Sequence, residues 1–177
     1  RRWLEAWNLP VAVTPKVKGW VDETNENFVG VFGGMAVDGV MVEALKHADL
    51  LVGFGLDPVE VDKTWHVDLP IVWVLQAPLA LQIVPEGNLV SAKHSALLQD
   101  LLEMQPPRSW DSAFRDTKQH LNDIYTNGGS DKLHENPVAA VRVMAEALPP
   151  ETIVTTDVGS HKYIFGQFWP SRQPQTF

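Results

Sequence analysis

The feature that most constrains the fold of this chain is a series of short, continuously apolar runs separated by segments with helical spacing. Because these runs do not alternate apolar with polar residues, both faces of each strand are expected to be buried. Buried strands that alternate with helices predict an α/β fold with a three-layer parallel sheet. The expected strands cover residues 10–14, 28–32, 49–55, 70–75 and 81–84.

Helices are expected between the strands. A first helix, closed by Asn8, is indicated by apolar residues at helical spacing, namely Trp3, Leu4 and Trp7. A second helix is expected over 40–48. Ser91 can cap a third helix, whose predicted buried stripe consists of Leu97, Leu98, Leu101 and Leu102.

A boundary is predicted at Pro106-Pro107, after which the chain becomes more polar. The segment 109–125 has one apolar face at helical spacing, made of Trp110, Phe114, Leu121 and Ile124. Asn127-Gly128-Gly129-Ser130 is typical of a loop. We therefore expect residues 105–134 to be an interdomain linker that contains a helix.

A new α/β unit is expected to begin at Asn136-Pro137, because Asn is a good N-cap and Pro a good first helical residue. The predicted buried stripe of this helix is Val138, Val141, Ala145 and Leu148, and Pro149-Pro150 stops it. A strand over 153–156, a turn over 157–161 and a helix over 162–168 complete the predicted unit.

Composition excludes several classes of protein. The 14 Lys and Arg against 22 Asp and Glu leave a net charge of −8, which argues against nucleic-acid binding. Without cysteine, disulfide scaffolds and thiolate zinc sites are excluded. The six histidines form no HxxxH or HExxH pair, so no metal site is expected. No apolar run has the roughly 18 residues that a membrane helix needs.

Glycines at strand ends are candidates for nucleotide binding, since ligands of open parallel sheets bind at the carboxyl ends of the strands. Gly53-Phe54-Gly55 begins a dinucleotide fingerprint, but Pro58 occupies the place of the third glycine. A tight turn is the simpler interpretation of these glycines. The acidic residues that follow, Asp57, Glu60 and Asp62, favour a solvated loop over acid–base catalysis.

The segment Asp157-Val158-Gly159-Ser160-His161 carries the strongest local chemistry. A predicted strand leads here into a glycine turn and the start of a helix, where backbone N–H groups and the helix dipole favour an anion. Ser160 and His161 add side-chain donors. Phosphate binding and a helix start without a ligand both remain open on this pattern.

The order of these segments resembles thiamine-diphosphate-dependent enzymes of the acetolactate synthase type. Residues 9–34 resemble the start of that family's central domain, and Ala48-Asp49 to Gly55 resemble a characteristic central-domain strand. Residues 136–149 and 153–161 resemble the opening of its diphosphate-binding domain. The resemblance covers most of 9–104 and 136–177.

The resemblance implies a division into a Rossmann-like central domain (1–104), the linker (105–134) and a truncated start of the diphosphate-binding domain (135–177). The family's first, interior strand is not found before the opening helix, which implies unpaired backbone groups at a gap in the sheet. The parent enzyme would contain further domains, and its magnesium-binding segment would follow Phe177.

The resemblance also implies site residues. Val158, Gly159, Ser160 and His161 would touch the diphosphate, although many relatives have Gln where this chain has Ser160. Some relatives bind FAD or ADP in the central domain. The nucleotide candidates here would be Gly33, Gly34, Gly53, Gly55 and Asp57. Because Leu56-Asp57 supplies no arginine for a phosphate, FAD is not expected.

The implied function is that of a cytoplasmic lyase or transferase fragment acting on 2-oxo acids, with thiamine diphosphate and Mg²⁺ as cofactors. The parent would be a homo-oligomer, a dimer or tetramer, and the fragment alone is expected to be inactive. No catalytic residue is expected within this chain. The alternative is a noncatalytic nucleotide-binding or assembly module on the same sheet. An NAD-type dehydrogenase is disfavoured by the failed fingerprint.

Overall fold

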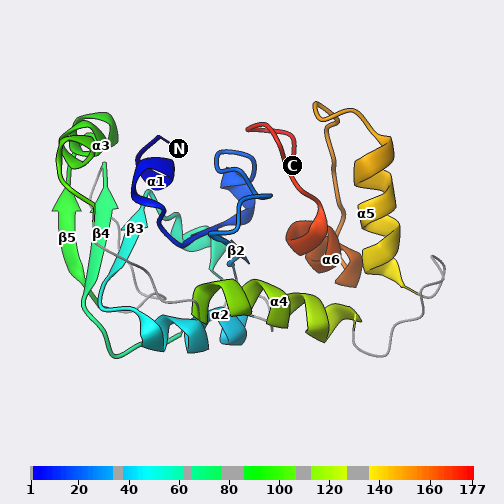
Figure 1. Cartoon of the computed structure of the whole chain (residues 1–177), viewed down its shortest axis with the longest axis horizontal. Helices are drawn as coiled ribbons and strands as arrows, with labels where there is room; N and C mark the ends of the chain where they lie inside the picture. The colour runs from blue at the N-terminus through cyan, green and yellow to red at the C-terminus, as the bar shows by residue number, and fades with distance from the viewer. Residues whose placement is uncertain (1, 34–37, 62–64, 77–85, 107–112, 127–135) are drawn as a thin grey trace.

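The computed structural model describes residues 2–33, 38–61, 65–76, 86–106, 113–126 and 136–177. Its strands are parallel, as predicted, and fall into two sheets (Figure 1). The chain is therefore an α/β protein with Rossmann-like parallel sheets. No helix among these residues has both the length and the apolar character needed to cross a membrane.

The first sheet pairs β1 (Val11–Val13) with β2 (Phe28–Val31). It follows α1 (Arg2–Trp7), which ends at Asn8 with a positive φ of 52° and so confirms the predicted helix end. The short 3-10 helix η1 (Pro15–Val17) lies between the two strands in sequence. β2 is buried along its whole length, so it forms the centre of this part of the molecule.

The second sheet has the order β3 (Leu51–Phe54), β4 (Ile71–Leu75), β5 (Asn88–Ser91). Before it come α2 (Asp38–Ala44) and the 3-10 turn η2 (Leu45–His47), and η3 (Pro58–Glu60) follows β3. β4 is largely buried, whereas every residue of β5 is exposed. The expectation that the predicted strands are covered on both faces is wrong for β1 and β3, where Ala12 and Val52 are exposed, and β5 itself was not predicted from the sequence.

The prediction around Ser91 is also wrong. Ser91 ends β5, and α3 (His94–Glu103) begins after Lys93, which makes no side-chain cap. None of the four leucines predicted as its buried stripe is fully buried, and the helix packs against α1. The strand predicted over 81–84 lies outside the described residues.

The predicted linker helix is present as α4 (Ala113–Thr126). It packs across β2 and α2, where Leu121 is buried against Val29 and Met41. Ile124 is exposed, so only part of the predicted apolar face is used. Trp110 lies outside the described residues.

The last unit contains α5 (Pro137–Ala147) and α6 (Ser160–Phe168), packed against each other through a cluster that includes Val141, Ala145 and Trp169. Asn136 caps α5 as predicted, accepting a hydrogen bond from the Ala139 N–H at 3.1 Å. Leu148, however, is exposed.

The strand predicted over 153–156 is wrong, because the segment has no strand partner among the described residues. The Val154 N–H instead donates to the Thr176 carbonyl at 2.9 Å, so the end of the chain folds back along this segment. Figure 1 shows the C-terminal stretch after α6 returning toward the first sheet.

Candidate functional site

The turn that begins α6 is an exposed helix N-terminus. Gly159, the residue before the helix, has φ 148°, a conformation that side chains other than glycine rarely adopt. Within the described residues the N–H groups of Gly159, Ser160 and His161 have no acceptor. Val158 beside them is 88% exposed. The sequence-predicted residues therefore lie together at this helix start, where Ser160 and His161 are exposed and Gly159 is half-buried.

Two side chains shape this turn. The Asp157 carboxylate accepts the Val158 N–H at 2.7 Å, which leaves the next N–H groups free. The His161 ring lies against Gly159, since a Cβ added there would be 2.7 Å from His161 Cε1. Free donors at the positive end of a helix dipole match the chemistry of a diphosphate. The residues present thus fit one side of a diphosphate site.

The nucleotide candidates at the strand ends are occupied by the protein's own groups. Gly53 packs under the Trp73 ring, because an added Cβ would be 2.2 Å from its Cζ3 atom. The N–H of Gly33 donates to Asp38 at 3.2 Å. Gly55, with φ 62°, faces the ring of His94. Gly34 lies outside the described residues.

Asp57, the remaining nucleotide candidate, pairs with the ammonium group of Lys16 at 2.8 Å. Lys16 lowers the pKa of Asp57 through this hydrogen bond, and the same contact raises the pKa of Lys16. Close by, the Glu60 carboxylate accepts from Thr14 Oγ1 at 2.6 Å and from the Lys16 N–H at 2.8 Å. These contacts join the carboxyl ends of β1 and β3. Asp62 lies outside the described residues.

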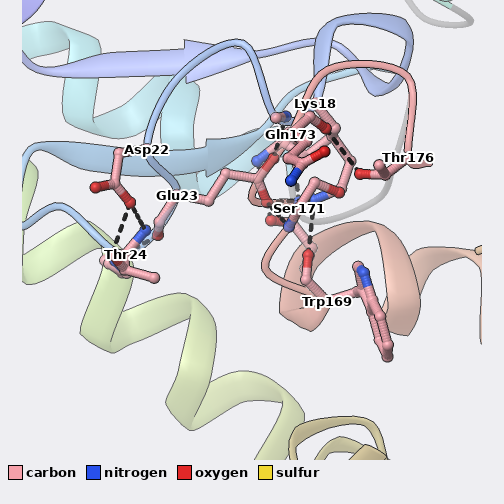
Figure 2. Close-up of polar contacts among 12 residues, drawn as sticks. Lys18, Asp22, Glu23, Thr24, Trp169, Ser171, Gln173 and Thr176 are labelled. Carbon is pink, nitrogen blue, oxygen red and sulfur yellow. Dashed lines mark hydrogen bonds and ion pairs between the residues drawn. The ribbon is translucent and has the colours of Figure 1, made fainter. Parts of the chain in front are cut away.

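A buried ion pair between Lys18 and Glu23 was not predicted from the sequence (Figure 2). The side chain of Lys18 is 0% exposed and that of Glu23 3%, and their charged atoms are 2.6 Å apart. Burial lowers the pKa of Lys18, and the nearby Glu23 carboxylate opposes that shift. In the structure Gly19 has a positive φ of 79°, a conformation that favours glycine. The glycine directly after Lys18 is therefore the local signal that the sequence offered.

The pair contacts the segment that follows α6. Lys18 Nζ donates to the Trp169 carbonyl at 3.0 Å, and Glu23 accepts from the Ser171 N–H at 3.1 Å. Glu23 also accepts from the Gly19 N–H at 2.9 Å. Figure 2 shows these groups converging between the loop after β1 and the C-terminal stretch. The contacts with Trp169 and Ser171 span 151 and 148 positions, so inspection of local motifs could not find them.

No group of three or more His, Cys, Asp or Glu residues that could hold a metal ion occurs in the described part of the chain. Thus the described residues provide donors for an anion, but they do not provide a carboxylate-rich metal centre.

The sequence is similar to a known protein family and to a known enzyme. Residues 1–72 match the family model described as thiamine pyrophosphate enzyme, central domain. The chain is 24% identical to an acetolactate synthase of Bacillus subtilis (strain 168), over 99% of the chain and 32% of that enzyme. The chain therefore spans about a third of the length of the curated relative it matches. Residues 1–72 are thus similar to the central domain of thiamine pyrophosphate enzymes, and nearly the whole chain is similar to part of an acetolactate synthase.

Proposed function

We propose that this chain is part of a thiamine-diphosphate-dependent lyase or transferase acting on 2-oxo acids, and that the start of α6 binds the cofactor's diphosphate. The observation that carries the proposal is the set of N–H groups at Gly159, Ser160 and His161, which have no acceptor among the residues that the structure describes. The similarity to an acetolactate synthase over nearly the whole chain supports the substrate class.

In this proposal the chain binds the diphosphate of the cofactor and orients it. The N–H groups of Ser160 and His161 would donate to diphosphate oxygens, and Gly159 adopts the positive φ with which the chain enters the helix. Thiamine diphosphate, when bound, supplies the nucleophilic carbon with which 2-oxo acids are decarboxylated or joined. We propose that the ligands of Mg²⁺ come from elsewhere in the complete protein.

The domain organisation is part of the proposal. Residues 1–104 would form the central domain, 105–134 the linker, and 135–177 the start of the diphosphate-binding domain. We propose that the complete enzyme is a cytoplasmic homo-oligomer and that residues 1–177 alone lack activity. We propose that neither a nucleotide nor FAD binds at the strand ends. The Trp73 ring fills the space next to Gly53, and the Lys16 ammonium group pairs with the Asp57 carboxylate.

The experiment that tests the diphosphate site is a Ser160→Pro substitution in the full-length protein that carries this sequence. Proline is favoured at the first helical position, so α6 is expected to form while one N–H donor is lost. A hydrogen bond to a charged group contributes about 1.5–3 kcal/mol. We therefore expect thiamine diphosphate, titrated with Mg²⁺ in a calorimeter, to bind at least roughly tenfold more weakly.

Ser160→Ala is the matched control, because it removes the hydroxyl and keeps the N–H. It should reduce the affinity less than Ser160→Pro does. If Ser160→Pro binds thiamine diphosphate as tightly as the unchanged protein, the site is not at the start of α6. If the purified 177-residue chain binds the cofactor with micromolar affinity, the proposed dependence on further domains is wrong.

A further inference from the structure

The C-terminal end of α6 is attached to the first sheet by polar contacts that the diphosphate site does not use. Lys18 Nζ donates to the carbonyl of Trp169, the residue that ends α6, and Ser171 donates to Glu23. The Lys18 ammonium group also lies 5.1 Å from the centre of the Phe177 ring. The pair therefore contacts three separate points of the C-terminal stretch.

A second contact attaches the same helix to β2. The Gln167 side chain accepts from the Val31 N–H at 3.0 Å and donates to the Val31 carbonyl at 2.5 Å. The amide thus pairs with the backbone of β2 as a neighbouring strand would. Because Gln167 lies in the last turn of α6, both sets of contacts act on the same end of the helix.

Close packing at Gly19 makes this attachment specific in position. A Cβ added to Gly19 would be 2.0 Å from the Gln173 carbonyl oxygen, so the C-terminal stretch lies directly on the backbone there. Thr176 Oγ1 donates to the same Gln173 oxygen at 2.7 Å. A shift of the stretch along its own direction would move the Gln173 backbone away from Gly19 and break the contacts with Lys18 and Glu23.

The geometry of the Lys18–Glu23 pair indicates that it orients the end of α6 more than it stabilises the fold. The free-energy cost of removing two charges from water offsets most of their mutual attraction, so a buried pair adds little net stability. Its hydrogen bonds are directional, however, and here all the acceptor sites of Glu23 that are described face backbone N–H groups or Lys18. They therefore define where the end of α6 lies relative to β1 and β2.

We propose that Lys18, Glu23 and Gln167 are positioning residues for the diphosphate-binding turn, which lies one helix length away. The nine residues of α6 span about 13 Å, and a helix transmits the placement of one end to the other. With its last turn attached to the first sheet and one flank packed on α5, the helix presents Gly159–His161 in a single place. This inference rests on the proposed function.

The test compares Gln167→Met and Lys18→Met in the full-length protein. Each should weaken the binding of thiamine diphosphate with Mg²⁺ by roughly tenfold, because the loosened turn must be ordered again on binding. Amide hydrogen exchange without cofactor should become faster across 160–171 in both variants. Lys18→Met leaves Glu23 buried without its cation and is expected to destabilise the fold strongly, whereas Gln167 is only half-buried and its variant is expected to fold.

Ile71→Val is the control for a general loss of stability. It shortens a buried side chain in β4, away from α6, and is expected to cost a similar modest amount of stability while leaving cofactor affinity unchanged. If Gln167→Met binds the cofactor as tightly as the unchanged protein, this inference is wrong while the proposed function stands. The same holds if Ile71→Val loses as much cofactor affinity as Gln167→Met does. Failure of the unchanged full-length protein to bind thiamine diphosphate would overturn the proposed function and this inference together.

Discussion

At the scale of single residues, Lys18 shows how burial and a partner act in opposite directions on one pKa. Burial, the larger effect, lowers the pKa of Lys18 below its ordinary 10.5, and Glu23 raises it by charge and hydrogen bond. Glu23→Gln should therefore lower the pKa of Lys18 further, as measured by NMR titration of its side-chain signals. Asp22→Asn is the control, because Asp22 acts on the pKa of Lys118.

The sign of the accompanying pH dependence follows from the same shift. In the interval between the lowered folded pKa and 10.5, the unfolded chain binds more protons at Lys18 than the folded chain does. The contribution of Lys18 to the free energy of unfolding therefore rises with pH across that interval. An unchanged or raised pKa of Lys18 in Glu23→Gln would contradict this account.

At the scale of elements, α5 is the helix whose start the sequence specifies most completely. The Asn136 side chain accepts the Ala139 N–H, and Pro137 occupies the first helical position. Asn136→Ala should lower the free energy of unfolding by about 1 kcal/mol, because a partly buried N–H group at the helix start loses its partner. Chemical denaturation measures the change. Asn136→Asp keeps an acceptor and should restore most of the loss; an Asp variant as unstable as the Ala variant would exclude capping as the cause.

Elements could be predicted where the signal is local and could not where it depends on neighbours. The apolar runs that became β1 to β4 and the cap of α5 are local patterns, and they were found. Ile153–Thr156 has the same β-branched character, yet it forms no strand, since a strand requires a partner and the described residues offer none. Ser91 likewise has capping chemistry but ends a strand.

The candidate site also has a part that local sequence predicts and a part that depends on distant neighbours. The turn proposed to bind the diphosphate could be picked out because Gly159, Ser160 and His161 are adjacent in sequence. The attachment of α6 was not, because Gln167 and Val31 are separated by 136 positions and Lys18 and Trp169 by 151. Such contacts depend on how the two sheets and the C-terminal stretch come together, which no local pattern encodes.

At the scale of the whole molecule, β1 and β3 have no strand between them among the described residues, so side chains join the two sheets. Glu60, after β3, accepts from Thr14 and from the Lys16 backbone after β1. The Lys16–Asp57 pair beside it is exposed and screened by solvent, so it is expected to contribute little. Glu60 is therefore expected to be the main polar connection at this end of the sheets.

Glu60→Ala should lower the free energy of unfolding by about 1–2 kcal/mol, since two hydrogen bonds to a charged acceptor are lost at a half-buried position. Glu43→Ala is the matched control, because Glu43 pairs with Lys46 on the exposed face of one helical segment and should change stability by less than about 0.5 kcal/mol. Urea denaturation of both variants measures the difference. Equal effects would show that the two sheets are joined by packing, and that the carboxylate contacts at their carboxyl ends are incidental.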